Sequence, residues 1–243
     1  MLKDYLKLFL QKILGFKTYL FIFSILTIKR TKHEEEFLYF NKMIPDGGTV
    51  LDIGANIGAM TVLMGKSAKN AFIYAFEPMP ENAETLKKIV NFYKLKNVKI
   101  FEAALGEQKG ELKMVMPVIS NIKMQGLSHV LEEGSDEEWN KGEVFSVPVL
   151  KLDEIEELRN GNRITAIKID VENFEYHVLK GGEELLLKHK PIIFCELWEN
   201  DKRVLTLNYL QNLGYKVQVY EDNQLKDYTD QKALNFFFVP NAA

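Results

Sequence analysis

The chain has 243 residues, 47% of them hydrophobic, which is enough to bury the core of one large α/β domain. Its formal net charge is only −3, and this excludes the strongly basic surface by which many proteins bind nucleic acid. Cys195 is the only cysteine, so no disulfide can form within the chain. We therefore expect a cytoplasmic protein with no nucleic-acid partner.

The first 36 residues form a basic arm that precedes an acidic remainder. Between Met1 and Lys32, seven basic residues stand against one acid, which gives this segment a charge of +6. Apolar residues recur there at the spacing of an amphipathic helix, namely Leu2, Tyr5, Leu6, Phe9, Ile13 and Phe16. Such a helix could pack on the core of the domain or lie on an anionic membrane surface. The apolar run at 19–28 is too short to span a bilayer, which takes about 20 residues.

After the arm, residues 37–243 alternate short β-rich runs with helical patterns. This order is typical of a mostly parallel sheet with helices on both faces. The predicted strands are 49–53, 72–76, 98–103, 165–170 and 191–197. Helices are predicted to begin near Ile57, Pro80, Leu152, Phe174 and Asp201.

Two regions depart from this alternation. The runs 215–220 and 233–240 leave no room for a crossover helix between them, so we predict that they pair as an antiparallel hairpin. Between 110 and 149, two β-like runs flank about two dozen mostly polar residues. Because a stretch of that length in a compact domain is usually functional or disordered, we predict a long loop or lid near 114–145.

A glycine-containing turn follows the first predicted strand, in the stretch VLDIGANIGAM at 50–60. Gly54 allows the chain to turn where a Cβ would clash, and Gly58 allows a ligand or a neighbouring backbone to approach closely. A dinucleotide site would need G-x-G-x-x-G, whereas this turn reads D-x-G-x-N-x-G and includes Asp52 and Asn56. Because Asp52 would repel a pyrophosphate and attract an ammonium or a sulfonium, the turn disfavours NAD and indicates a cationic ligand.

Glu77 ends the second predicted strand, at the strand tip next to this turn. An acid at this distance along the chain suits hydrogen bonds to both hydroxyls of an adenosine ribose. A single acid at a strand tip can also be a solvated end, so the interpretation depends on its combination with the glycine turn. Together the two features indicate a nucleotide-like cofactor at the carboxyl edge of the sheet.

Six stretches in this order resemble successive motifs of the FkbM-type S-adenosylmethionine-dependent methyltransferases. The resemblance runs from about Phe37 to Pro240 and leaves only the basic arm uncovered. The motifs are LDIGANIG, FEPMPENAETLKKIV, AALGEQKGEL, IKIDVENFEYHVLKGG, PIIFCEL and NFFFVP.

The resemblance implies the class I methyltransferase fold. This is a Rossmann-like α/β fold with helices on both faces of a seven-stranded, mostly parallel sheet whose last strand is antiparallel. The resemblance also implies S-adenosylmethionine as the cofactor and a hydroxyl of a sugar, glycolipid or secondary metabolite as the methyl acceptor. It implies cofactor contacts for Asp52, Gly54, Asn56, Gly58, Glu77, Glu102, Ala103, Ala104 and Asp170.

Methyl transfer to a hydroxyl needs a base that removes its proton as the new bond forms. The resemblance places Asp170 and Glu172 at the reaction centre, and either could be this base. The alternative for Asp170 is a helix cap, because DVENFE opens the next predicted helix. His129 in the predicted loop is a further candidate, since imidazole titrates near neutral pH. Glu175, in the same motif, is expected to be structural.

Two smaller expectations concern the same motif. Asn173 stands where the family usually has glycine, and asparagine tolerates the left-handed backbone conformation that such a position needs. Asp170 and Glu196, with Glu172, could hold a divalent cation that binds a vicinal diol of the acceptor. We do not favour metal dependence, and no residue is assigned as a metal ligand.

The sequence therefore predicts an S-adenosylmethionine-dependent O-methyltransferase that acts on a small-molecule or glycan acceptor. One alternative is an NAD(P)-dependent oxidoreductase on a similar sheet. Another is a membrane-surface binding protein whose methyltransferase domain is inactive. Contact with the periphery of a membrane through the arm is one expectation, and packing of the arm on the core is the alternative.

Overall fold

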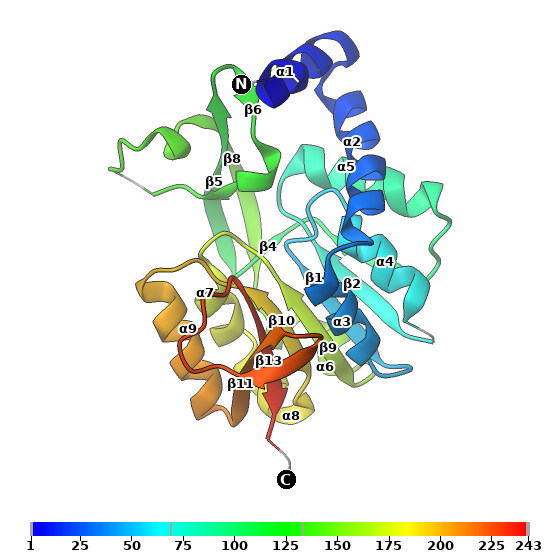
Figure 1. The fold of residues 1–243 in the computed structure, drawn as a ribbon, viewed down its shortest axis with the longest axis vertical. Helices are drawn as coiled ribbons and strands as arrows, with labels where there is room; N and C mark the ends of the chain where they lie inside the picture. Colours follow the sequence, from blue (N-terminus) through cyan, green and yellow to red (C-terminus); the bar gives the residue numbers. More distant parts are fainter. Residues whose placement is uncertain (1, 69, 133, 242–243) are drawn as a thin grey trace.

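The structure is a computed structural model that describes residues 2–68, 70–132 and 134–241, with side chains from Leu6 onward. Within those residues, an eight-stranded sheet forms the centre of the molecule (Figure 1). Its spatial order is β12 (Gln224–Asp227), β11 (Tyr215–Glu221), β13 (Asn235–Pro240), β10 (Ile192–Glu196), β9 (Ile164–Ile169), β1 (Thr49–Ile53), β2 (Phe72–Phe76) and β3 (Val98–Phe101). The strands from β10 to β3 are parallel, and β13 is antiparallel to both of its neighbours. The predicted α/β fold with an antiparallel last strand is confirmed.

The predicted number of strands in this sheet is wrong. The segment after β11 was expected to be a turn, but β12 returns along β11 and adds an eighth strand at the edge of the sheet. Asp222 and Asn223 form the connection with φ angles of 51° and 64°. Two successive residues with positive φ make the tight turn that joins neighbouring antiparallel strands, and Asp and Asn tolerate it better than most residues.

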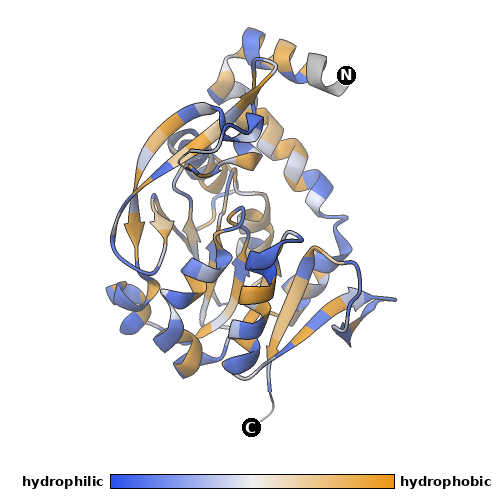
Figure 2. Ribbon diagram, turned by 90° about the vertical axis from the view of Figure 1, so that its left-hand side faces the viewer, coloured by the Kyte–Doolittle hydropathy of each residue, from blue (hydrophilic) through white to orange (hydrophobic). Residues whose placement is uncertain are grey.

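Helices cover both faces of the central sheet. The alternation of side chains along β1 divides the core: Val50 faces one layer, and Leu51 and Ile53 face the other. The first layer comprises α2 (Phe16–Thr31), α3 (Glu35–Met43), α4 (Ala59–Ser67) and α5 (Pro80–Phe92). The second layer comprises α6 (Glu156–Arg159), α7 (Glu175–Lys180), α8 (Glu183–His189) and α9 (Asp201–Asn212). Figure 2 shows the hydrophobic strands enclosed between these helices.

Both ends of the predicted loop or lid near 114–145 are strands, and the residues between them contain only short elements. The strands β5 (Gly110–Ile119) and β8 (Gly142–Leu150) pair antiparallel from Gly110 to Pro117 and form a second sheet. Three short strands extend it: β4 (Ala104–Leu105), β6 (Ile122–Lys123) and β7 (His129–Val130). The long hairpin stands apart from the central sheet (Figure 1). Met114, Met116 and Val147 stabilise it by packing with Met79 in a separate hydrophobic cluster.

The basic arm is not separate from the domain. The predicted boundary at residue 36 falls inside α3, and α2 contacts α4 and α5. Leu20 and Ile28 of α2 are buried. The first helix, α1 (Leu2–Leu14), contacts α2 and β6 instead (Figure 1). No helix in the described residues is long and apolar enough to cross a bilayer.

Candidate active site

The loop between β1 and α4 brings the chain against the end of β9. Gly54 has a φ of 74°, and a Cβ there would lie 1.8 Å from the carbonyl oxygen of Asp170. Gly58 has a φ of 85°, and its Cβ would lie 2.7 Å from the side chain of Leu86. Both positions therefore need glycine, as the sequence predicted. At both glycines, the atoms that a Cβ would meet belong to another part of the protein and not to a ligand.

Asp52 lies beneath this loop and is completely buried. Its Oδ2 accepts a hydrogen bond of 2.5 Å from Thr61, and its Oδ1 is 3.5 Å from Nζ of Lys168. Lys168 is also buried and donates a hydrogen bond of 2.8 Å to the carbonyl oxygen of Gly54. The prediction that Asp52 faces a cationic ligand is thus corrected, because the cation that it faces is the ammonium group of Lys168.

Lys168 is a site residue that the sequence analysis missed. Burial acts to lower the pKa of Lys168, but the charges of Asp52 and Asp170 outweigh it and raise this pKa above its ordinary value. The ammonium group thus stays charged, and its Nζ lies 3.9 Å from Oδ2 of Asp170. The available signal was a lysine inside a mostly apolar parallel strand, two residues before Asp170.

Glu77 lies at the tip of β2 with only 4% of its surface exposed. Its Oε2 accepts a hydrogen bond of 2.7 Å from the backbone N–H of Asn56. Its Oε1 accepts hydrogen bonds from the backbone of Met79 at 2.9 Å and from the side chain of Asn82 at 3.3 Å. Burial raises the pKa of Glu77 to about 7, although these hydrogen bonds oppose the rise. The carboxylate is therefore held in one orientation beside the glycine loop.

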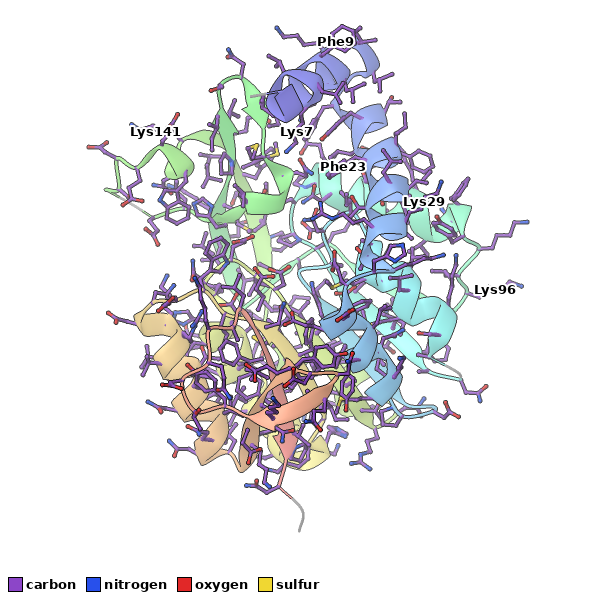
Figure 3. The ribbon with its side chains drawn as sticks, viewed as in Figure 1. Lys7, Phe9, Phe23, Lys29, Lys96 and Lys141 are labelled. Carbon is purple, nitrogen blue, oxygen red and sulfur yellow. The ribbon has the colours of Figure 1, made fainter. Side chains whose placement is uncertain are left out.

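Two neighbouring cavities open at the carboxyl ends of β1, β2 and β9. The smaller, of about 60 Å³, is lined by Glu77 and Glu172 among others. The larger, of about 540 Å³, extends toward α1 and α2, where Phe23 and Leu26 line it. Figure 3 shows Phe23 on the side of α2 that faces the second sheet. Five residues line both cavities: Gly54, Asn56, Gln125, Gly126 and Asp170.

Two buried polar atoms next to these cavities lack a partner within the described part of the chain. They are Oδ1 of Asn56 and Oε1 of Gln125. Because an unsatisfied buried acceptor costs about 1–3 kcal/mol, both atoms are suited to accept hydrogen bonds from a ligand. Gln125 was not identified from the sequence, because it belongs to the segment that was predicted to be a loop.

The residues after β9 form a strained turn that presents two acids. Glu172 and Asn173 have φ angles of 51° and 70°, so the left-handed conformation expected for Asn173 is confirmed. Glu175 is buried and accepts hydrogen bonds from the backbone of Val171 at 3.3 Å and of Asn173 at 3.2 Å. The structure thus supports the structural role expected of Glu175.

The acids of this turn repel one another in a partly buried environment. Burial raises the pKa of Glu172 to about 8, and the negative charges of Asp170 and Glu196 contribute to the rise. Burial and the charge of Asp170 likewise raise the pKa of Glu196 to about 7. Groups with a pKa near neutrality can exchange protons at physiological pH. Among the described residues, no three His, Cys, Asp or Glu side chains are arranged to hold a metal ion.

His129 does not reach the site, and its predicted role as a base is corrected. The side chain is 2% exposed and lines neither cavity. Its Nδ1 lies 2.8 Å from the carbonyl oxygen of Leu127, and its ring packs on Trp139 with 3.9 Å between centroids. Pairing of β7 with β5 directs this side chain into the second sheet.

The structure does not bring the segment after β3 to either cavity. Glu102 is exposed and forms an ion pair with Lys87, Ala103 is buried, and Ala104 pairs with Val149 in the second sheet. The cofactor contacts of these three residues stay a prediction.

Comparison with known proteins shows similarity to methyltransferases. A family model described as the methyltransferase FkbM domain matches residues 52–217. The chain is 25% identical over 219 residues to Methyltransferase 1 of Beauveria bassiana (strain ARSEF 2860), which covers 81% of this chain and 87% of that protein. It is 27% identical over 177 residues to Methyltransferase sdnD of Sordaria araneosa, which covers 64% of this chain and 68% of that protein.

A solved structure shares the fold. Methyltransferase FkbM from Methylobacillus flagellatus KT matches 92% of this chain with a TM-score of 0.54 and 16% sequence identity. This chain spans 55% of that longer protein. The residues that the family model matches include the glycine loop, Glu77 and the turn after β9. The chain therefore belongs to the FkbM methyltransferase family.

Proposed function

We propose that this protein is an S-adenosylmethionine-dependent O-methyltransferase whose acceptor is a hydroxyl of a sugar, a glycolipid or a secondary metabolite. The observation that carries the proposal is the meeting of two cavities at the strand tips, with Asp170 lining both. Glu77 lines the smaller cavity, where its carboxylate suits ribose hydroxyls, and the larger cavity, of about 540 Å³, has the volume of a small-molecule site. Family membership supports methyl transfer as the reaction.

The residues around the smaller cavity fit the polar groups of S-adenosylmethionine. The carboxylate of Glu77 is held by three donors and keeps further acceptor capacity for ribose hydroxyls. Oδ1 of Asn56 is a buried acceptor without a partner among the described residues, and it suits an ammonium group. When bound, the cofactor supplies an electrophilic methyl group on a sulfonium.

Asp170 is placed to act on an acceptor in the larger cavity. Its carboxylate is about one-third exposed and is held near the ammonium group of Lys168. From this position it can accept the proton of a hydroxyl while the acceptor is kept in line for attack. Glu172 lines only the smaller cavity of the two. We therefore assign the role of base to Asp170.

A thermal-shift titration of the full chain tests the proposal. We expect S-adenosylhomocysteine to raise the melting temperature and NAD(H) to have no effect, because binding to the native state stabilises it. Stabilisation by NAD(H) alone would support the oxidoreductase instead. A screen of cell glycans, lipids and small metabolites with methyl-labelled cofactor would then identify the acceptor, and transfer only to nitrogen or carbon would contradict the O-methyl assignment.

A further inference from the structure

The helix α1 presents an apolar face to solvent. Leu6, Phe9 and Ile13 have exposed fractions of 57%, 58% and 64%. At 100° per residue they lie within about 60° of one another around the helix axis, so they form one stripe. Figure 3 shows α1 at one end of the molecule with Phe9 projecting away from it. This stripe was expected to pack on the core or to face a membrane, and in the structure it does not pack on the core.

The other side of α1 is fixed to the protein by polar contacts. Gln11 is buried, and its Nε2 donates a hydrogen bond of 3.1 Å to the carbonyl oxygen of Lys123. The backbone N–H of Lys123 donates one of 3.2 Å to Oε1 of Gln11. An amphipathic helix that is stabilised by its own domain turns its apolar stripe inward. Here the polar Gln11 faces β6, and the stripe is left for a partner.

The charge near this stripe is mainly positive, with Asp4 the single acid of α1. From Tyr5 to Lys32 the sequence contains no acid, and its basic residues are Lys7, Lys12, Lys17, Lys29, Arg30 and Lys32. Lys12, Lys29 and Arg30 are exposed. Lys17 pairs with Glu84 of α5. The acidic remainder of the chain makes this end of the molecule its basic pole.

We propose that α1 docks on the surface of an anionic lipid bilayer. Leu6, Phe9 and Ile13 would enter the boundary between head groups and acyl chains, while the surrounding lysines contact lipid phosphates. An exposed apolar stripe flanked by basic residues is the pattern of helices that lie in the membrane interface. A second copy of this chain is the less favoured occupant, since its own basic pole would repel this one.

Docking would also bring the larger cavity close to the membrane surface. Leu26 of α2 is 56% exposed and lines that cavity together with Lys7 of α1. In Figure 3, Lys7 lies between α1 and the second sheet. The cavity thus borders the same end of the molecule as the apolar stripe. If the proposed function holds, a lipid-linked acceptor could reach Asp170 from the membrane.

Sedimentation of the full chain with vesicles tests the proposal. We expect binding to phosphatidylcholine vesicles that contain phosphatidylglycerol, weak binding to phosphatidylcholine alone, and loss of binding at about 1 M salt. The triple variant Leu6→Ser, Phe9→Ser, Ile13→Ser should lower the partition coefficient by about tenfold or more. A matched control is Val204→Ser, Leu205→Ser on α9, where two apolar residues are 55% and 53% exposed. The control should bind as the unchanged protein does.

Three results would overturn the proposal. They are equal binding by the triple variant, equal loss in the α9 control, and self-association of the unchanged protein that the triple variant abolishes without any vesicle binding. The third result would assign the stripe to a second copy. Because the substituted residues are exposed, the variant should melt like the unchanged protein and keep its response to S-adenosylhomocysteine, so failure of docking can be told apart from failure of the proposed function.

Discussion

Glu77 and Glu172 line the same small cavity, but their surroundings differ. Three donors hold the carboxylate of Glu77, and its pKa is about 7 because these hydrogen bonds offset much of the effect of burial. Burial and three neighbouring acids raise the pKa of Glu172 to about 8, and Lys168 only partly opposes them. The difference shows that hydrogen bonds hold the acid at the tip of β2 in place, whereas burial and mutual repulsion act on the acid after β9.

The largest expected effect comes from Asp170→Asn, which removes the proposed base from the turn after β9. Methyl transfer should fall by about 10²–10⁴-fold, because an amide cannot accept the proton of the hydroxyl. Affinity for S-adenosylhomocysteine should change by less than about tenfold. Single-turnover assays and calorimetric titration measure the two quantities. Full activity in this variant, together with loss of activity in Glu172→Gln, would transfer the role of base to Glu172.

A smaller effect is expected from Glu77→Gln, which alters the fixed acceptor. An amide has one oxygen acceptor and cannot satisfy the donors on both sides of Glu77 and a ribose as well. The affinity for S-adenosylhomocysteine should fall by about 10–100-fold, the value of hydrogen bonds to a charged group. Glu138→Gln is the matched control, because that exposed acid lies outside both cavities and has no predicted cofactor contact. An equal loss of affinity in both variants would contradict the role of Glu77.

A pH-dependent gain in stability, rather than a loss of function, is expected from Glu172→Gln. The pKa of Glu172 rises from 4.5 to about 8 on folding, so its ionisation lowers the stability of the native protein progressively between those two values. Because glutamine does not ionise, the variant does not lose this stability as the pH rises. Its melting temperature relative to the unchanged protein should therefore be nearly equal at acidic pH and higher by about ten degrees above about pH 8.

Thermal melts across this pH range measure the difference. Glu138→Gln, at an exposed position between β7 and β8, serves as the control and should show no such trend. A gain that does not vary with pH would mean that Glu172 is not titrating. In the Asp170→Asn background the trend should move to lower pH, because one of the negative charges that raise the pKa of Glu172 is gone.

Most of the central sheet could be predicted from the sequence. The strands β1 and β2 have the predicted bounds, and α5 and α9 begin at Pro80 and Asp201 as expected. Short apolar runs between helical patterns are a local signal. The two β-like runs that form β5 and β8 were identified, but their pairing into a second sheet was not predicted, because they lie more than twenty residues apart.

In the candidate site, too, some features could be predicted from the sequence and others could not. The turn at Gly54 and the left-handed conformation at Asn173 were predicted and are observed, because glycine and asparagine tolerate positive φ better than other residues do. The partners of Asp52 and His129 could not be predicted. Asp52 meets Lys168 only because β9 lies beside β1 in the sheet, and His129 meets Trp139 only because β7 joins β5.

For the helix α1, the sequence determines one property and the tertiary structure another. The order of its residues determined by itself that the helix is amphipathic and basic, since the spacing of side chains around an α-helix is set by its geometry. Only the tertiary structure decided which side faces the protein. The paired hydrogen bonds between Gln11 and Lys123 turn the polar side inward, and the apolar stripe is exposed because those two residues meet across more than one hundred positions of the chain.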